Sequence, residues 1–151
     1  MPPEPAPDHG AVAQEETLHA SAVAAEGRAV LILGPSGSGK SSLALELLAL
    51  GAQLVGDDRV RLRRMGGALI AEPPRRAGGL IEARGVGLLH APRAGPAPVA
   101  LAVDLARQER ERLPPRRMAR FLGIAVPVLH DPATRAFPAA ILQYLRCGRF
   151  A

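Results

Sequence analysis

A glycine-rich loop of the form G-x-x-x-x-G-K-S constrains the fold of this chain more than any other feature. In such a loop the glycines turn backbone N–H groups toward phosphate oxygens, the lysine reaches the outer phosphates, and the final serine hydroxyl binds Mg²⁺. The only lysine of the chain lies in this loop; the other basic side chains are arginines. The motif predicts a nucleotide site for ATP and Mg²⁺, against the alternative of a structural Gly/Ser turn. Its members are Gly34, Pro35, Ser36, Gly37, Ser38, Gly39, Lys40 and Ser41.

The flanking sequence predicts a strand before the loop and a helix after it. Residues 28–33 are a short apolar run typical of a buried strand, and residues 42–50 repeat apolar side chains at helical spacing up to Gly51. Several predicted hairpins accompany this unit, so we expect an α/β fold with a P-loop strand–loop–helix unit in a mixed sheet. Further strands are expected at 18–25, 53–55, 59–64, 68–71, 99–103 and 124–129, a helical turn at 118–122 and a terminal helix at 139–146.

Composition narrows the class of protein. At 151 residues the chain predicts one domain, with residues 1–16, rich in proline and acids, as a disordered tail and residues 17–151 as a P-loop kinase catalytic domain. No apolar run is long enough to span a membrane, the start does not resemble a secretory signal, and a single cysteine, Cys147, fits a reducing cytoplasm. The net charge of +5 comes from scattered arginines, which favours an acidic protein or a phosphate group over nucleic acid as the partner.

Carboxylates supply the other candidate site residues. Asp57 and Asp58 close an apolar strand, where Mg²⁺ or an attacking hydroxyl needs a carboxylate; the alternative is a turn. Neighbouring side chains on a strand point to opposite sides, so we expect one to face the nucleotide and the other a supporting partner. Glu82 and Arg84 lie two residues apart before a Gly-x-Gly turn. They either belong to an exposed edge strand or bind Mg²⁺ and phosphate. His19, alone in a predicted strand, is most simply a core residue.

Together these segments resemble the catalytic domain of the HPr kinase/phosphorylase family, whose members phosphorylate a serine of the phosphocarrier protein HPr. The resemblance rests on His19, the loop at 34–41, the stretch 51–60 with its aspartate pair, and the Glu-x-Arg-Gly-x-Gly stretch within 81–87. It extends over about residues 17–147. The family implies a core like that of phosphoenolpyruvate carboxykinase and assembly as hexamers.

The resemblance also implies roles for individual residues. Lys40 and the loop amides would hold the β-phosphate, and Ser41 and Glu82 would bind Mg²⁺. Asp58 would accept the proton of the substrate serine, and would return it in the reverse reaction with inorganic phosphate.

The same family pattern gives roles to two further residues. His19 would support Asp58, and Arg112 matches an arginine that the family uses at its catalytic centre.

The chain departs from the family pattern at several points. Compared with that pattern, we expect a short tail in place of the N-terminal regulatory domain, and residues 130–135 in place of a longer region associated with dephosphorylation. It therefore resembles the short form found in some proteobacteria, for which kinase chemistry is better supported than phosphorylase chemistry.

Three functions follow from these observations. The first is an ATP-dependent protein-serine kinase acting on HPr or a nitrogen-related HPr paralogue. Another small P-loop kinase is the second, and a nucleotide-binding regulatory module that signals without phosphoryl transfer is the third. Glu82 and Asp58 favour catalysis, because sensing a nucleotide needs no general base.

Overall fold

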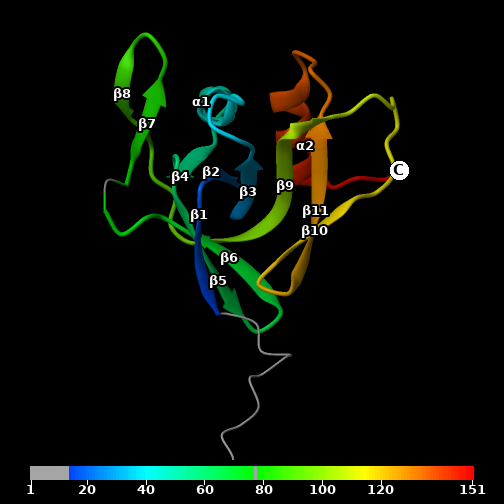
Figure 1. The fold of residues 1–151 in the computed structure, drawn as a ribbon, viewed down its shortest axis with the longest axis horizontal. Helices are drawn as coiled ribbons and strands as arrows, with labels where there is room; N and C mark the ends of the chain where they lie inside the picture. The colour runs from blue at the N-terminus through cyan, green and yellow to red at the C-terminus, as the bar shows by residue number, and fades with distance from the viewer. Residues whose placement is uncertain (1–13, 77) are drawn as a thin grey trace, which may run out of the picture.

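The computed structural model describes residues 14–76 and 78–151, which form eleven strands and two helices (Figure 1). Neither helix in this part of the chain has the length and apolar character needed to cross a membrane. The elements are β1 (Glu15–Leu18), β2 (Ser21–Ala25), β3 (Arg28–Leu33), α1 (Lys40–Ala49), β4 (Gln53–Gly56), β5 (Val60–Met65), β6 (Ala68–Glu72), β7 (Leu80–Ala83), β8 (Gly87–His90), β9 (Ala97–Gln108), β10 (Met118–Phe121), β11 (Ile124–Asp131) and α2 (Phe137–Cys147).

Nine strands form one sheet. The sheet is mixed, as the sequence predicts. Its main path runs β1-β5-β6-β9-β3-β2-β4, and β11 joins it through β9 and pairs with β10. Strand β9 pairs in parallel with β3 and β11 but antiparallel with β6. Strand β9 is 12 residues long, and its first residues pair with β6. The strand bends, so it connects the part of the sheet around β6 to the part around β3 (Figure 1). The sheet is therefore curled, and β7 and β8 form a separate hairpin.

The central strand β3 is buried on both faces, which explains its uninterrupted apolar sequence. Val30 and Ile32 pack in a core cluster with residues of α1 and α2, including Leu47 and Ile141. Leu31 belongs to a second cluster with side chains of β5, β6 and β11. Successive side chains of β3 thus point alternately into the two core clusters. The helices cover one face of the strand, and the curled sheet encloses its other face.

The predicted hairpin of β2 and β3 is confirmed, but its first strand is shorter than expected. The chain turns at Glu26 and Gly27, which both have positive φ, as a two-residue hairpin turn requires. The strand expected at 18–25 divides at His19, because Leu18 ends β1, which pairs with β5, whereas β2 pairs with β3 and β4. This division leaves His19 in a connection between strands, outside the core.

Two other expectations differ from the structure. The helical turn expected at 118–122 is wrong: Met118–Phe121 form strand β10, paired with β11. Pro127 does not interrupt β11, since the strand changes partner there from β10 to β9, and the missing proline N–H costs no ladder bond at that point. The tail expected at 1–16 falls mostly on residues 1–13, outside the described residues, and Glu15 and Glu16 belong to β1.

Candidate active site

The loop at residues 34–39 connects the carboxyl end of β3 to the first residue of α1. Gly34 and Gly39 have φ values of +149° and +98°, in the region that side chains rarely adopt. A Cβ at Gly34 would also collide with the side chain of Ser38. Helix α1 starts at Lys40 without a side-chain cap, so its first amide groups face the loop. The motif thus places a helix N-terminus, with its partial positive charge, at the end of the central strand.

Lys40 folds back over this loop. Its Nζ donates hydrogen bonds to the carbonyl oxygens of Gly34, at 2.6 Å, and Pro35, at 3.2 Å. An ammonium has three donors, so one remains for an anion within the loop. The side chain that sequence analysis selects for phosphate contact therefore lies over the place where the phosphate would bind.

Asp57 is the centre of a partly buried network of hydrogen bonds that joins three elements. Its Oδ1 accepts hydrogen bonds from the hydroxyls of Ser41, at 2.7 Å, and Ser21, at 2.8 Å. Its Oδ2 accepts one from the backbone N–H of Glu82, at 3.0 Å. We call Ser21, Ser41, Asp57 and Glu82 the Asp57 network. Sequence analysis did not identify Ser21; its one signal was a hydroxyl in an otherwise apolar strand.

Asp58 points away from this network. It has a φ of +67°, and 72% of its side chain is exposed. The positive φ turns its carboxylate away from that of Asp57, so the two adjacent aspartates have different environments. His19 lies beside it, with Nδ1 at 3.6 Å from an oxygen of Asp58. His19 is exposed, so the expectation that it is a core residue is wrong.

A cavity of about 340 Å³ brings most of the predicted site residues together. A larger cavity of about 530 Å³ lies against β1 and β5, and arginines and glutamates form most of its wall. It contains none of the predicted site residues, so the smaller cavity is the candidate site. The residues lining the smaller cavity are Ser36, Gly37, Gly39, Lys40, Ser41, Ser42, Asp58, Glu82 and Arg84.

Comparison with known proteins shows which protein family this chain belongs to. A family model described as the HPr Serine kinase C-terminal domain matches residues 10–94, more than half of the chain. The chain belongs to the HPr serine kinase C-terminal domain family. It is 42% identical to the HPr kinase/phosphorylase of Clostridium botulinum (strain Eklund 17B / Type B) over 78 residues, which are 52% of this chain and 26% of that protein. With the HPr kinase/phosphorylase of Clostridium tetani it shares 42% identity over 81 residues, 54% of this chain and 27% of that protein.

A solved structure resembles nearly the whole chain. The Hpr(Ser) kinase/phosphatase from Coxiella burnetii matches with a TM-score of 0.74 and 32% sequence identity, covering 87% of this chain and 94% of that one. The match extends the family resemblance over the mixed α/β fold. The chain spans only about a quarter of the length of the two clostridial relatives.

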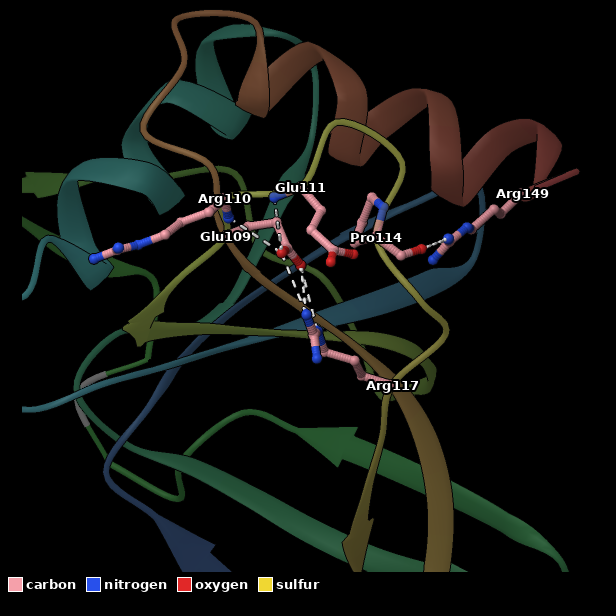
Figure 2. A network of polar contacts seen from close by, with 6 residues as sticks. All are labelled: Glu109, Arg110, Glu111, Pro114, Arg117 and Arg149. Carbon is pink, nitrogen blue, oxygen red and sulfur yellow. Dashed lines mark hydrogen bonds and ion pairs between the residues drawn. The ribbon is translucent and has the colours of Figure 1, made fainter.

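Arg112 lies apart from the cavity of this family member. It belongs to the exposed segment 110–113 of the loop between β9 and β10, and it is not among the cavity's lining residues. The base of this loop is held firmly (Figure 2). The N–H of Glu109 donates to the carbonyl oxygen of Asp131, at 2.7 Å, and the N–H of Val128 donates to that of Arg117, at 2.9 Å.

Glu109 holds the loop through its side chain as well. Its carboxylate, only 8% exposed, accepts hydrogen bonds of 3.2–3.3 Å from the guanidinium of Arg117 and others from the backbone N–H groups of Arg110 and Glu111. The bond from Arg117 is the main reason that the pKa of Glu109 lies below its ordinary value; loss of hydration opposes it. Arg149 donates to the carbonyl oxygen of Pro114 on the far side of the loop (Figure 2). We call Glu109, Arg117 and these backbone partners the Glu109 network.

The described residues contain no group of three or more His, Cys, Asp or Glu side chains that could hold a metal ion.

Proposed function

We propose that this chain is an ATP-dependent protein-serine kinase that phosphorylates an HPr-like phosphocarrier protein, HPr itself or a nitrogen-related paralogue. The observation that carries the proposal is the cavity that brings Lys40, Ser41, Asp58 and Glu82 together at the loop before α1. Membership of the HPr serine kinase family supports HPr as the substrate. Phosphate-dependent reversal is the second activity that the names of the relatives suggest.

The loop fits the phosphates of a nucleotide. Open space surrounds Gly37 and Gly39, where nothing lies within 4 Å of the position a Cβ would take, so an anion can approach the bare backbone. The buried hydroxyl of Ser38 has no hydrogen-bond partner in the protein. Lys40 and Arg84 contribute positive charge to the same cavity. These features together support phosphate binding by the loop amides and Lys40.

The arrangement of Ser41 also fits Mg²⁺. Because Ser41 donates its hydroxyl proton to Asp57, the lone pairs of its Oγ remain free for a cation. The Glu82 carboxylate lines the same cavity, and the bond from its N–H to Asp57 fixes the backbone that carries it. ATP, when bound, supplies the phosphoryl group, and Mg²⁺ offsets the charge of its phosphates.

Asp58 is the group we assign as general base. A bond forms between the substrate serine oxygen and the γ-phosphorus as the bond from phosphorus to the leaving ADP oxygen breaks, and the serine proton passes to the Asp58 carboxylate. His19, 3.6 Å from Asp58, is assigned to support that carboxylate. We assign Arg112 to stabilising the negative charge of the transition state. For this role it has to approach the cavity from the tip of its loop. We also propose, from the family resemblance, a core like that of phosphoenolpyruvate carboxykinase, assembly as a hexamer, a cytoplasmic location and a catalytic domain over residues 17–151.

A transfer assay tests the function directly. Purified chain, Mg²⁺ and [γ-³²P]ATP are incubated with HPr, and the labelled residue of HPr is identified by mass spectrometry. Label on a serine of HPr, absent from a reaction with Asp58→Asn, supports the proposal. Tight ATP binding without label in HPr or its paralogue would overturn it, in favour of a nucleotide-binding regulatory module.

The metal assignment has its own test. We expect Glu82→Gln to raise the Mg²⁺ concentration needed for half-maximal transfer by at least about tenfold, because the change removes a charged oxygen ligand but keeps the shape. Affinity for the nucleotide without Mg²⁺ should change little. An Mg²⁺ dependence equal to that of the unaltered protein would reject Glu82 as a ligand.

A further inference from the structure

The hairpin of β7 and β8 exposes large apolar side chains beside the candidate active site. Val86, in its turn, is 74% exposed, and Leu88, in β8, is 70% exposed. The hairpin projects from the body of the molecule near the first turn of α1 (Figure 1). Exposed apolar residues that gather at one place next to a catalytic cavity are typical of an interaction surface.

The register of the hairpin gives Leu88 the same face as Glu82. The two residues are direct cross-strand partners in the antiparallel pair, and partners in such a pair project to the same side. The other side of β7 is buried, since Ile81 packs in the core cluster that includes Leu43 of α1. Leu88 therefore lies on the face whose glutamate lines the cavity.

The position of this face relative to the proposed base is fixed by the protein. Burial of Ile81 anchors β7 to the core, and the bond from the N–H of Glu82 to Asp57 ties the same strand to the residue before Asp58. An isolated two-stranded hairpin is marginally stable in water, so these anchors decide where it stands. A molecule resting on Leu88 would thus be held at a set distance from Asp58.

We propose that Val86 and Leu88 form the docking surface for the HPr-like protein substrate and that they contact an apolar side chain of that protein. The inference rests on the proposed function. A cavity of about 340 Å³ that holds nucleotide phosphates has no room for a folded protein, whose serine must reach Asp58 from outside, across the rim that this hairpin forms. Burying an apolar side chain of the substrate against Leu88 removes both surfaces from water and orients the serine hydroxyl.

The test is steady-state phosphorylation of HPr by variants that change only exposed side chains. We expect Leu88→Ser combined with Val86→Ser to raise the KM for HPr by about tenfold or more, since a loss of apolar contact weakens docking. The matched control is Met65→Ser, an apolar residue 51% exposed at the end of β5, which should leave the KM for HPr within about twofold. Leu88→Met keeps an apolar side chain at this position and should therefore retain most of the affinity for HPr. Melting temperatures verify that every variant is folded.

A double-mutant cycle makes the partner explicit. Apolar surface residues of HPr are replaced by serine one at a time, and each variant is assayed with both the unaltered chain and Leu88→Ser. Strongly non-additive KM changes for any of them support direct contact, whereas additive changes for all of them or a KM for HPr unaffected by the hairpin variants would overturn the docking surface. If the unaltered chain labels no serine of HPr, the proposed function fails first, and the docking inference fails with it. Labelling by the unaltered chain with normal KM in the hairpin variants defeats the docking inference alone.

Discussion

The Asp57 network and the Glu109 network each place a carboxylate at the centre of a set of hydrogen bonds near the carboxyl ends of the central strands, but they hold different kinds of structure. Asp57 joins side chains and backbone from β2, α1 and β7, so three elements meet around the cavity. Glu109 binds mainly groups within its own loop, together with Arg117 and the backbone of β11. The first network assembles the site; the second fixes the base of a loop and leaves its tip exposed.

In the function that we propose, this difference separates two contributions to phosphoryl transfer. The residues that we assign to phosphate, Mg²⁺ and the base lie around the Asp57 network. Arg112, on the loop that the Glu109 network anchors, does not line the cavity. We therefore expect changes at the cavity to have larger effects on transfer than changes at the loop, and the variants below test that ranking.

The largest effect is expected at Lys40. Lys40→Ala removes the ammonium that lies over the loop, and because phosphoryl transfer relies on positioning and electrostatics, we expect the transfer rate to fall by about a thousandfold. The measurement is the initial rate of HPr labelling at saturating ATP. Lys40→Arg, which keeps the charge on a differently shaped group, should recover only part of the rate. A rate for Lys40→Ala within about tenfold of normal would end the assignment of the loop to phosphate.

Asp58→Asn should be next, with a loss of at least about a hundredfold in transfer, because asparagine cannot accept the serine proton. ATP affinity should stay within a few-fold. The matched control is Asp57→Asn, which should reduce transfer less but lower the melting temperature, since Ser21 and Ser41 both donate to this carboxylate. The opposite order of transfer rates would make Asp57 the base and reverse the roles that we assign to the half-buried and the exposed aspartate.

The cavity was largely predictable from sequence because its parts are local patterns. Glycines at 34, 37 and 39 between an apolar run and a helix admit few arrangements, and the aspartate pair follows the next short strand. The contact between Ser21 and Asp57 joins residues 36 positions apart, and no periodicity along the chain indicates it. Tertiary contacts of this kind depend on how the sheet curls, which sequence patterns do not specify.

The second half of the chain was less predictable for the same reason. The segment Met118–Phe121 is too short to distinguish a helical turn from a strand by its pattern, and it becomes a strand because β11 lies beside it. Pro127 is compatible with β11 only because the strand changes partner there. The position of Arg112 follows from a loop whose two ends are set by such pairings, so the role that the family resemblance implies gave no indication that Arg112 does not line the cavity.

A smaller effect is expected at Arg112, and it measures how much the loop contributes. Arg112→Ala should lower kcat for HPr phosphorylation by about tenfold or more while ATP affinity is unchanged, since a positive charge that meets the transferring group acts only during the reaction. Arg110→Ala, an exposed arginine in the same loop, is the matched control and should change kcat by less than about twofold. Equal effects of the two variants would show that the loop supplies general positive charge, with no special part for Arg112.

The smallest effect on transfer is expected at Glu109. The pH dependence of the melting temperature separates the contribution of its charge to stability from that of its shape. The pKa of Glu109 is lowered in the folded protein, chiefly by the bond from Arg117, so the folded state binds this proton more weakly than the unfolded state does. Its stabilisation is therefore complete above the ordinary glutamate pKa and is lost as the pH falls through the lowered value. Glu109→Gln should lower the melting temperature by a few degrees at about pH 7, and this difference should shrink at acid pH. Transfer at neutral pH should fall only a few-fold, because the variant loosens the base of the loop and leaves the cavity intact. Glu111→Gln, its exposed neighbour, should alter neither quantity; a Glu109→Gln deficit that does not change with pH would mean that shape, not the charge paired with Arg117, holds the loop.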